Sequence, residues 1–95
     1  MLTMWYPLEN ADEIGKLFVS GKLAKLPDFV KRVNLLMTAD GEIKVYSLYE
    51  VQDDKVAEGF IAITKRLAGY RVTKGVRFKI EPVLEAKDAL ALIGL

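Results

Sequence analysis

Cysteine and histidine are both absent from this chain of 95 residues. Without cysteine there is no disulfide and no thiolate chemistry, and without histidine there is no imidazole for proton transfer. The usual zinc sites and the commonest haem ligand are excluded as well. We therefore expect no metal site and no cofactor.

An excess of charge of either sign is also lacking. The chain has 14 basic and 13 acidic residues, for a formal net charge of +1. This balance argues against a strongly electrostatic partner such as a nucleic acid or an anionic membrane surface, although it leaves local patches open. No apolar stretch approaches the ~20 residues of a membrane-crossing helix, and the first residues lack the basic segment and long apolar run of a signal peptide. We expect a cytoplasmic protein with no membrane partner.

Apolar residues, in contrast, are abundant. They make up 52% of the sequence, and the mean hydropathy is +0.17. We expect one domain over residues 1–95, and a chain of this length buries only about 60–65% of its unfolded surface. The apolar content exceeds what a small monomer easily hides, so we expect a homodimer.

The pattern of apolar residues predicts alternating strands and helices. Strands are expected at about 2–6, 30–38, 42–51 and 76–83, and helices at about 11–25, 53–68 and 85–93. Asn10 and Glu13 have the spacing of a capping box at the start of the first helix, and Asp53 or Asp54 is expected to cap the second. This order, β-α-β-β-α-β plus a short C-terminal helix, predicts an α+β, ferredoxin-like fold. Its antiparallel four-stranded sheet would carry helices on one face and leave the other face open.

The segment around "ADG" predicts a β-hairpin, and the side-chain pattern predicts its register. A three-residue loop over 39–41, ending in a left-handed glycine, pairs Met37 with Ile43. One face of the hairpin then holds Val33, Leu35, Met37, Ile43 and Val45. The other face holds Arg32, Asn34, Leu36, Lys44, Tyr46, Leu48 and Glu50. A slip of one residue would exchange the faces, so the clean separation favours this register.

The first strand is apolar on both of its faces. One parity places Thr3 and Trp5 on the open side of the sheet, and the other places Leu2, Met4 and Tyr6 there. We favour the first, because a large indole with one N–H suits an interface or a pocket. A strand of this kind suits the centre of a sheet that is covered on both sides. Helices cover one side, so the second cover must come from another subunit, a ligand or both.

The element order, the length and two segments, "KLPDFVKRV" and "FKIEPVLEA", resemble the dimeric α/β-barrel superfamily and its small uncharacterised bacterial members. The resemblance implies that two ferredoxin-like subunits stack sheet to sheet. The superfamily includes cofactor-independent monooxygenases, muconolactone isomerase-like enzymes, haem-degrading enzymes and stress-response proteins, so its fold does not settle a function. Its haem-handling members use a histidine, which this chain lacks, or a specific Asn-Trp arrangement; Asn34 and Trp5 supply those two residue types.

The open face of the sheet is where we expect a functional site. The residues predicted to line a ligand site or a dimer interface there are Trp5, Asn34, Leu36, Tyr46 and Leu48. Glu50 could serve as a general base if its surroundings are apolar. We prefer the interpretation that Glu50 is an acid at the end of a strand, where its side chain reaches solvent. Asn34 could orient an enolate or oxyanion, or it could satisfy a neighbouring backbone group.

Four functions are compatible with these patterns. The first is the binding of a small apolar or aromatic molecule between the stacked sheets of a homodimer. The alternatives are a structural or regulatory interaction module without a ligand, and a cofactor-independent, monooxygenase-like enzyme. RNA binding ranks last: Trp5 and Tyr46 beside basic residues imitate a stacking sheet, but "GEIKVYSLYEV" lacks the basic-Gly-aromatic string of RNA-recognition modules.

Overall fold

The chain forms four strands, three α-helices and three short 3-10 helices, and the computed structural model describes all of residues 1–95. The strands are β1 (Leu2–Pro7), β2 (Val30–Ala39), β3 (Glu42–Val51) and β4 (Arg77–Ile80). The α-helices are α1 (Ala11–Val19), α2 (Val56–Ala68) and α3 (Ala86–Leu92). The 3-10 helices are η1 (Leu8–Asn10), η2 (Asp53–Lys55) and η3 (Gly69–Val72). The order of strands and α-helices is the one that the sequence predicts.

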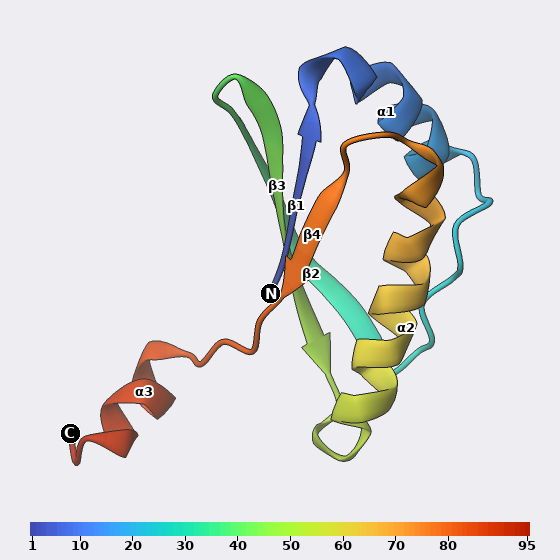
Figure 1. Ribbon diagram of the computed structural model, residues 1–95. Helices are drawn as coiled ribbons and strands as arrows, with labels where there is room; N and C mark the ends of the chain where they lie inside the picture. The colour runs from blue at the N-terminus through green and yellow to red at the C-terminus, as the bar shows by residue number, and fades with distance from the viewer.

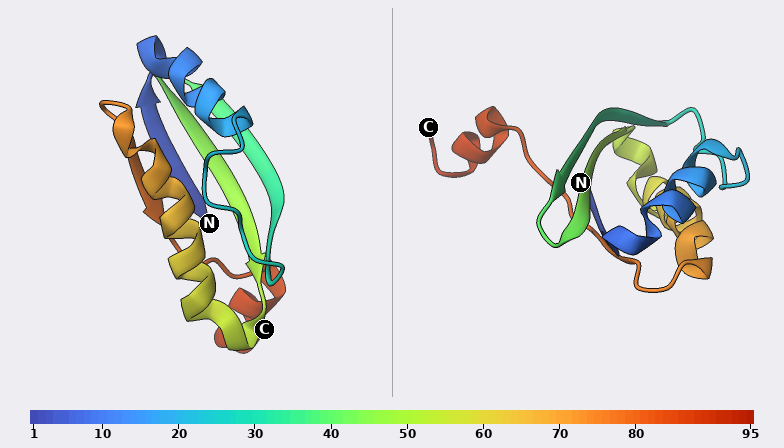
Figure 2. Two further views of the ribbon diagram at one scale, coloured as in Figure 1. Left: turned by 90° about the vertical axis from the view of Figure 1, so that its right-hand side faces the viewer. Right: turned by 90° about the horizontal axis from the view of Figure 1, so that it is seen from above.

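The strands form one antiparallel sheet in the order β2-β3-β1-β4, with β3 and β1 at its centre. Helices α1 and α2 pack against one face of the sheet, and no helix covers the other (Figure 1, Figure 2). We call these the helix face and the open face. The prediction of an α+β fold with a four-stranded antiparallel sheet is confirmed, and the arrangement is compatible with a ferredoxin-like fold.

The core lies between the sheet and the two helices. Alternate side chains of β1 point to the helix face, where Leu2, Met4 and Tyr6 are buried with Ile14 of α1 and Leu67 of α2. The other buried apolar residues of this cluster are Leu23, Val30, Ile43, Ile63 and Tyr70. The inward-facing side chains of β1 and the apolar stripes of α1 and α2 therefore form a single buried layer.

Helix α1 is shorter than the sequence predicts, because it does not reach residue 25. The Ser20 hydroxyl donates a hydrogen bond to the Leu17 carbonyl oxygen (2.8 Å) and accepts one from the Lys22 N–H (3.0 Å). Gly21 then adopts a positive φ of 75°, which a glycine does without steric cost. These two residues end the helix, and residues 20–29 run to β2 as an irregular segment.

The predicted side-chain caps of α1 and α2 are not formed. The Asn10 amide instead donates to the Lys74 carbonyl oxygen, and the Glu13 carboxylate accepts from the Thr73 hydroxyl at 3.0 Å. Both residues thereby tie the start of α1 to the segment before β4. The two aspartates expected to cap α2 lie in η2, and Lys55 occupies the position before the first helical residue.

Strands β2 and β3 form the predicted hairpin, but their register differs from the prediction by two residues. Ala39 pairs with Ile43 and Met37 pairs with Val45, so the loop consists of residues 40–42. The predicted pairing of Met37 with Ile43 is therefore wrong. Because side chains alternate with a period of two, a shift of two residues leaves these apolar side chains on their predicted face.

One irregularity in β2 does change the face of a residue. The register shifts between Arg32, which pairs with Tyr49, and Asn34, which pairs with Leu48. The extra residue, Val33, has no cross-strand partner and forms a β-bulge. Arg32 therefore lies on the helix face with Tyr49, and its predicted place on the open face is wrong.

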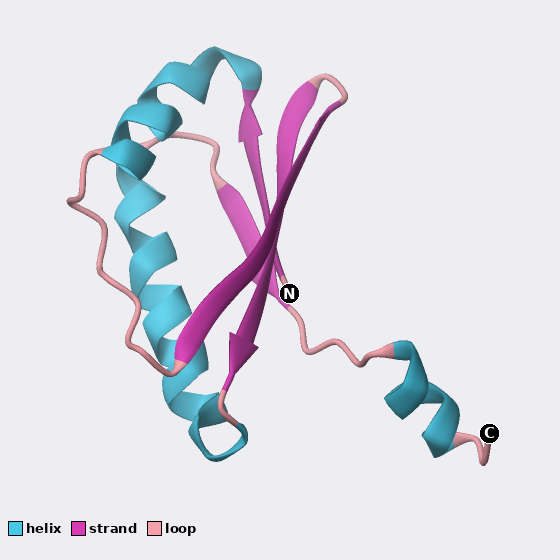
Figure 3. Ribbon diagram, turned by 180° about the vertical axis from the view of Figure 1, so that it is seen from behind, coloured by secondary structure: helices cyan, strands magenta, loops and turns pink.

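The C-terminal segment leaves the body of the molecule. Strand β4 ends at Ile80, before the predicted end at residue 83, and Pro82 follows. Helix α3 then projects away from the sheet, and residues 81–95 are all exposed (Figure 3). Helical spacing gives α3 an apolar stripe of Ala86, Ala89, Leu90 and Ile93. No other part of the chain covers this stripe.

Candidate functional site

The five residues predicted to form a ligand site or interface all lie on the open face. They are Trp5 from β1, Asn34 and Leu36 from β2, and Tyr46 and Leu48 from β3. Cross-strand pairing makes them neighbours, since Leu36 lies opposite Tyr46 and Asn34 lies opposite Leu48. Trp5 points away from the core, which is the favoured parity of the first strand. The structure thus places the five residues on one face, while their role in a ligand site or an interface stays a prediction.

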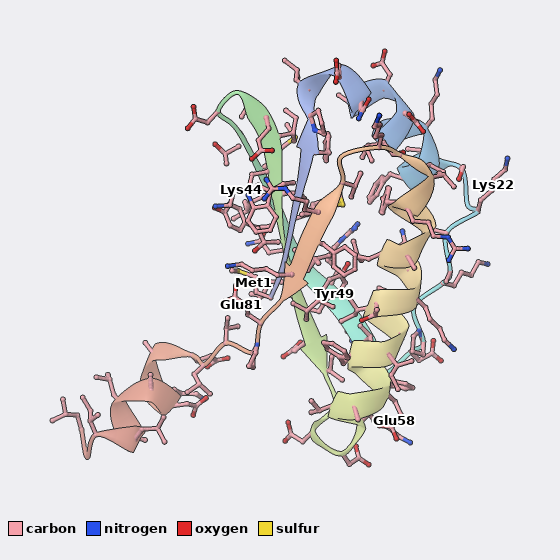
Figure 4. All side chains as sticks on the ribbon, viewed as in Figure 1. Met1, Lys22, Lys44, Tyr49, Glu58 and Glu81 are labelled. Carbon is pink, nitrogen blue, oxygen red and sulfur yellow. The ribbon has the colours of Figure 1, made fainter.

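Three basic side chains surround the Trp5 ring. The Arg77 Cζ lies 5.1 Å from the ring centroid, the Lys44 Nζ 5.6 Å and the Lys79 Nζ 5.7 Å. The same Lys44 ammonium lies 5.0 Å from the centroid of the Tyr46 ring. Figure 4 shows Lys44 on the side of the sheet away from the helices. Contacts of this kind fix the aromatic rings and add positive charge around them.

Carboxylates balance part of this charge. Arg77 pairs with Glu42 at 3.0 Å, and Lys79 pairs with Glu81 at 3.3 Å. A hollow of about 320 Å³ beside the Arg77–Glu42 pair is lined by Trp5, Thr38, Asp40, Glu42, Lys44 and Tyr46. Most of these lining side chains are polar or charged. A single copy of the chain therefore presents no apolar cavity on its open face.

The two candidate catalytic residues do not converge on Trp5. The Asn34 Oδ1 accepts a hydrogen bond from the N–H of Leu35 at 2.9 Å, beside the bulge. This is the backbone-satisfying role that the sequence left open for it. Glu50 is exposed near the end of β3, about 13 Å along the strand from Tyr46. Its environment is that of a strand-end acid in solvent.

The helix face contains a second candidate site, which the sequence did not predict. A cavity of about 240 Å³ lies between the sheet and the two helices. Leu2, Met4 and Tyr6 of β1 line it, together with Phe18 of α1 and Leu67 of α2. Most of its other lining residues are also apolar. A concave, mainly apolar pocket with a few polar groups is the commonest form of a small-molecule site.

The pocket exists because α1 does not cover the edge strand β2. Leu35 and Met37 face the helices, yet 43% and 67% of their surfaces are exposed. On the opposite side of this opening, Gly15 of α1 has no side chain, and a Cβ built there would meet no atom within 4 Å. The mouth of the pocket therefore lies between α1 and β2.

The polar groups of the pocket are two arginines, three tyrosines and a serine. Arg32 reaches the pocket from β2, and its Cζ lies 5.2 Å from the centroid of the Phe18 ring. Arg66 reaches it from α2 and donates from Nη1 to the Ala24 carbonyl oxygen at 3.1 Å. Tyr49 points from the sheet towards α2 (Figure 4). No carboxylate lines the pocket.

Burial and charge both act on the tyrosine hydroxyls. Burial raises the pKa of Tyr70 above its usual value, and Arg66 and Arg32 oppose the rise, while Tyr49 and Tyr6 add to it. Burial alone raises the pKa of Tyr6. The same five residues line the pocket. The arginines and phenols therefore share one environment.

Sequence reasoning missed this pocket for identifiable reasons. The sequence predicts Arg32 on the open face because nothing in it marks a bulge at residue 33. Arg66 has the ordinary place of a basic residue in the last turn of a helix, where it suits the helix dipole. The one available signal was Gly15, a glycine in the middle of a predicted helix, which often marks a packing or functional feature.

Comparisons of the chain with family models, with curated proteins and with solved structures found no significant match. The structure contains no helix with the length and apolar character that crossing a membrane requires. Any function of the chain is therefore inferred from the geometry of the two faces of the sheet.

Proposed function

We propose that this protein binds a small apolar or aromatic molecule in the pocket on the helix face. The observation that carries the proposal is a mainly apolar cavity of about 240 Å³ in which two arginines and three tyrosines converge. This differs from the predicted location, between the open faces of two subunits. The helix face is the better candidate because its cavity is apolar, whereas the hollow beside Trp5 is polar.

The volume limits the ligand to a small molecule. An apolar cavity of about 150 Å³ holds benzene, and drug-sized ligands occupy about 300–1,000 Å³. The pocket lies between these limits, so a substituted aromatic ring or a short aliphatic chain would fill it. The enzymatic alternative gains no comparable support, because the charged side chains in the pocket are arginines rather than acids.

Filling the pocket from α1 tests the proposal. Gly15→Leu adds a side chain where Gly15 leaves open space, so we expect it to weaken binding of the neutral aromatic probe toluene, measured by calorimetric titration, by about tenfold or more. Gly15→Ala is the matched control and is expected to bind as the parent does. Binding that survives in Gly15→Leu but is lost in Trp5→Ala would place the ligand on the open face and overturn the proposal.

We also propose that two copies associate through their open faces, as in the superfamily that the sequence resembles. Leu36 is 58% exposed there, and Leu48, Tyr46 and Trp5 lie beside it. A second sheet would remove this apolar and aromatic surface from water. Nucleic-acid binding has weaker support, because Arg77 and Lys79 are already paired with carboxylates.

A further inference from the structure

The two arginines of the pocket suggest a more specific ligand. Ion pairs in this chain involve Arg77, Lys79 and Lys87, and neither Arg32 nor Arg66 has a carboxylate within ion-pair distance. Both guanidinium groups nevertheless lie against an apolar pocket. Arg32 is exposed and Arg66 is half-buried, so an incoming anion can reach two guanidinium groups that have no carboxylate partner.

The contacts of each arginine leave donors free for such an anion. Arg66 uses Nη1 for the Ala24 carbonyl oxygen, which leaves the donors on Nη2 and Nε. Arg32 lies over the face of the Phe18 ring, and a guanidinium stacked in this way keeps its N–H groups available in its own plane. The two residues come from opposite walls, β2 and α2, so an anion between them would be held from both sides.

We propose that the ligand of this pocket is a carboxylate with an apolar body, and that Arg32 and Arg66 bind its carboxylate. This proposal rests on the proposed function of the same pocket. Arginine matches the planar geometry of a carboxylate, and such charge-assisted hydrogen bonds are about twice as strong as neutral ones. The phenol of Tyr70, which both arginines influence, is a further donor at the same place. The apolar remainder of the ligand would lie on Met4 and Leu67.

Calorimetric titration of the full chain with hexanoate, octanoate and decanoate, and with the corresponding alcohols, tests this proposal. We expect the best carboxylate to bind about tenfold or more tightly than its alcohol, since hydrogen bonds to charged groups exceed neutral ones by that order. Arg32→Gln and Arg66→Gln should each remove most of this difference and leave the affinity for the alcohol unchanged. Arg71→Gln is the matched control, because Arg71 is exposed and does not line the pocket.

The outcomes separate the two proposals. Equal affinity for acid and alcohol, or a preference for the acid that survives in both arginine variants, would overturn the carboxylate inference and leave the small-molecule proposal standing. Failure of both ligand series to bind, together with failure of the neutral aromatic probe, would overturn both. Because Arg66 also anchors the segment at Ala24, Arg66→Lys serves as a second variant that keeps the charge, and it should retain part of the preference.

Discussion

A few individual side chains give the pocket on the helix face its polarity. The rings of Tyr6, Tyr49 and Tyr70 pack among apolar side chains. Their hydroxyl groups add polar atoms to this mainly apolar layer. The arginines reach the same layer from the edge strand and from α2. At this scale the proposed function depends on groups that tolerate partial burial, because their apolar parts pack while their polar ends stay available.

The buried phenols make stability depend on alkaline pH. Burial favours the neutral form, so the folded pKa values of Tyr6 and Tyr70 lie above those of the unfolded chain. Their stabilisation is complete below the unfolded pKa of about 10 and is lost as the pH rises through the folded value. We expect the free energy of unfolding, measured with urea, to fall above that pH. The decline should be smaller in Tyr6→Phe and Tyr70→Phe than in the parent, and equal declines in all three would contradict this.

At the scale of elements, the decisive feature is how closely each helix approaches the sheet. Gly59 of α2 is buried, and a Cβ built on it would lie 2.5 Å from Cγ1 of Val51 at the end of β3. Gly15 of α1 faces open space instead. At Gly59, α2 is therefore in tight contact with the sheet, whereas α1 leaves open space beside Gly15, where the pocket lies.

Alanine substitutions at Gly15 and Gly59 should have opposite effects on stability. Gly15→Ala removes backbone freedom without a clash, so it should stabilise the chain by about 0.5–1 kcal/mol. Gly59→Ala should destabilise it by about 1–3 kcal/mol, because the stiff, β-branched Val51 must move. Urea unfolding of both variants measures the difference. Stabilisation by Gly59→Ala would show that α2 does not pack on β3 as closely as the structure places it.

The order of the strands and helices could be predicted from the sequence, but their ends and their spacing could not. Binary patterning predicted the order of strands and helices and placed Trp5 and Tyr46 together, because side-chain alternation survives errors of two residues. It could not predict the end of α1, which depends on Gly21 and on the contacts of Ser20. The pocket was not predictable either, since it depends on how far one helix covers β2.

For the whole molecule, three apolar surfaces lack cover within one copy of the chain. They are the open face around Leu36 and Leu48, the stripe of α3 that includes Leu90, and a groove beside α2 that is lined by Val56, Phe60 and Val83. A helix of this length has little stability on its own in water, so α3 would also gain from a partner. A stable dimer buries about 800 Å² on each partner, and a helix of seven residues offers less surface for this than a sheet of four strands.

Substitution on the open face tests the association that we propose. Leu36→Asp or Leu48→Asp places a charge in the centre of a stacked pair of sheets, where desolvation without a partner is costly. We expect sedimentation equilibrium to show a dimer for the parent and a monomer for either variant. Leu8→Asp is the matched control, because Leu8 is equally apolar and 62% exposed but lies in η1, away from the open face.

Substitution on the apolar stripe of α3 tests whether the dimer forms through α3 instead. Leu90→Glu disrupts that stripe, whereas Ala91→Glu adds the same charge on the polar side of the same helix. If the open face forms the interface, both variants remain dimers. A monomer with Leu90→Glu, together with a dimer for Leu48→Asp, would instead assign the association to α3. In that case the ring of cations around Trp5 would stay exposed to solvent, and the open face would need a different explanation.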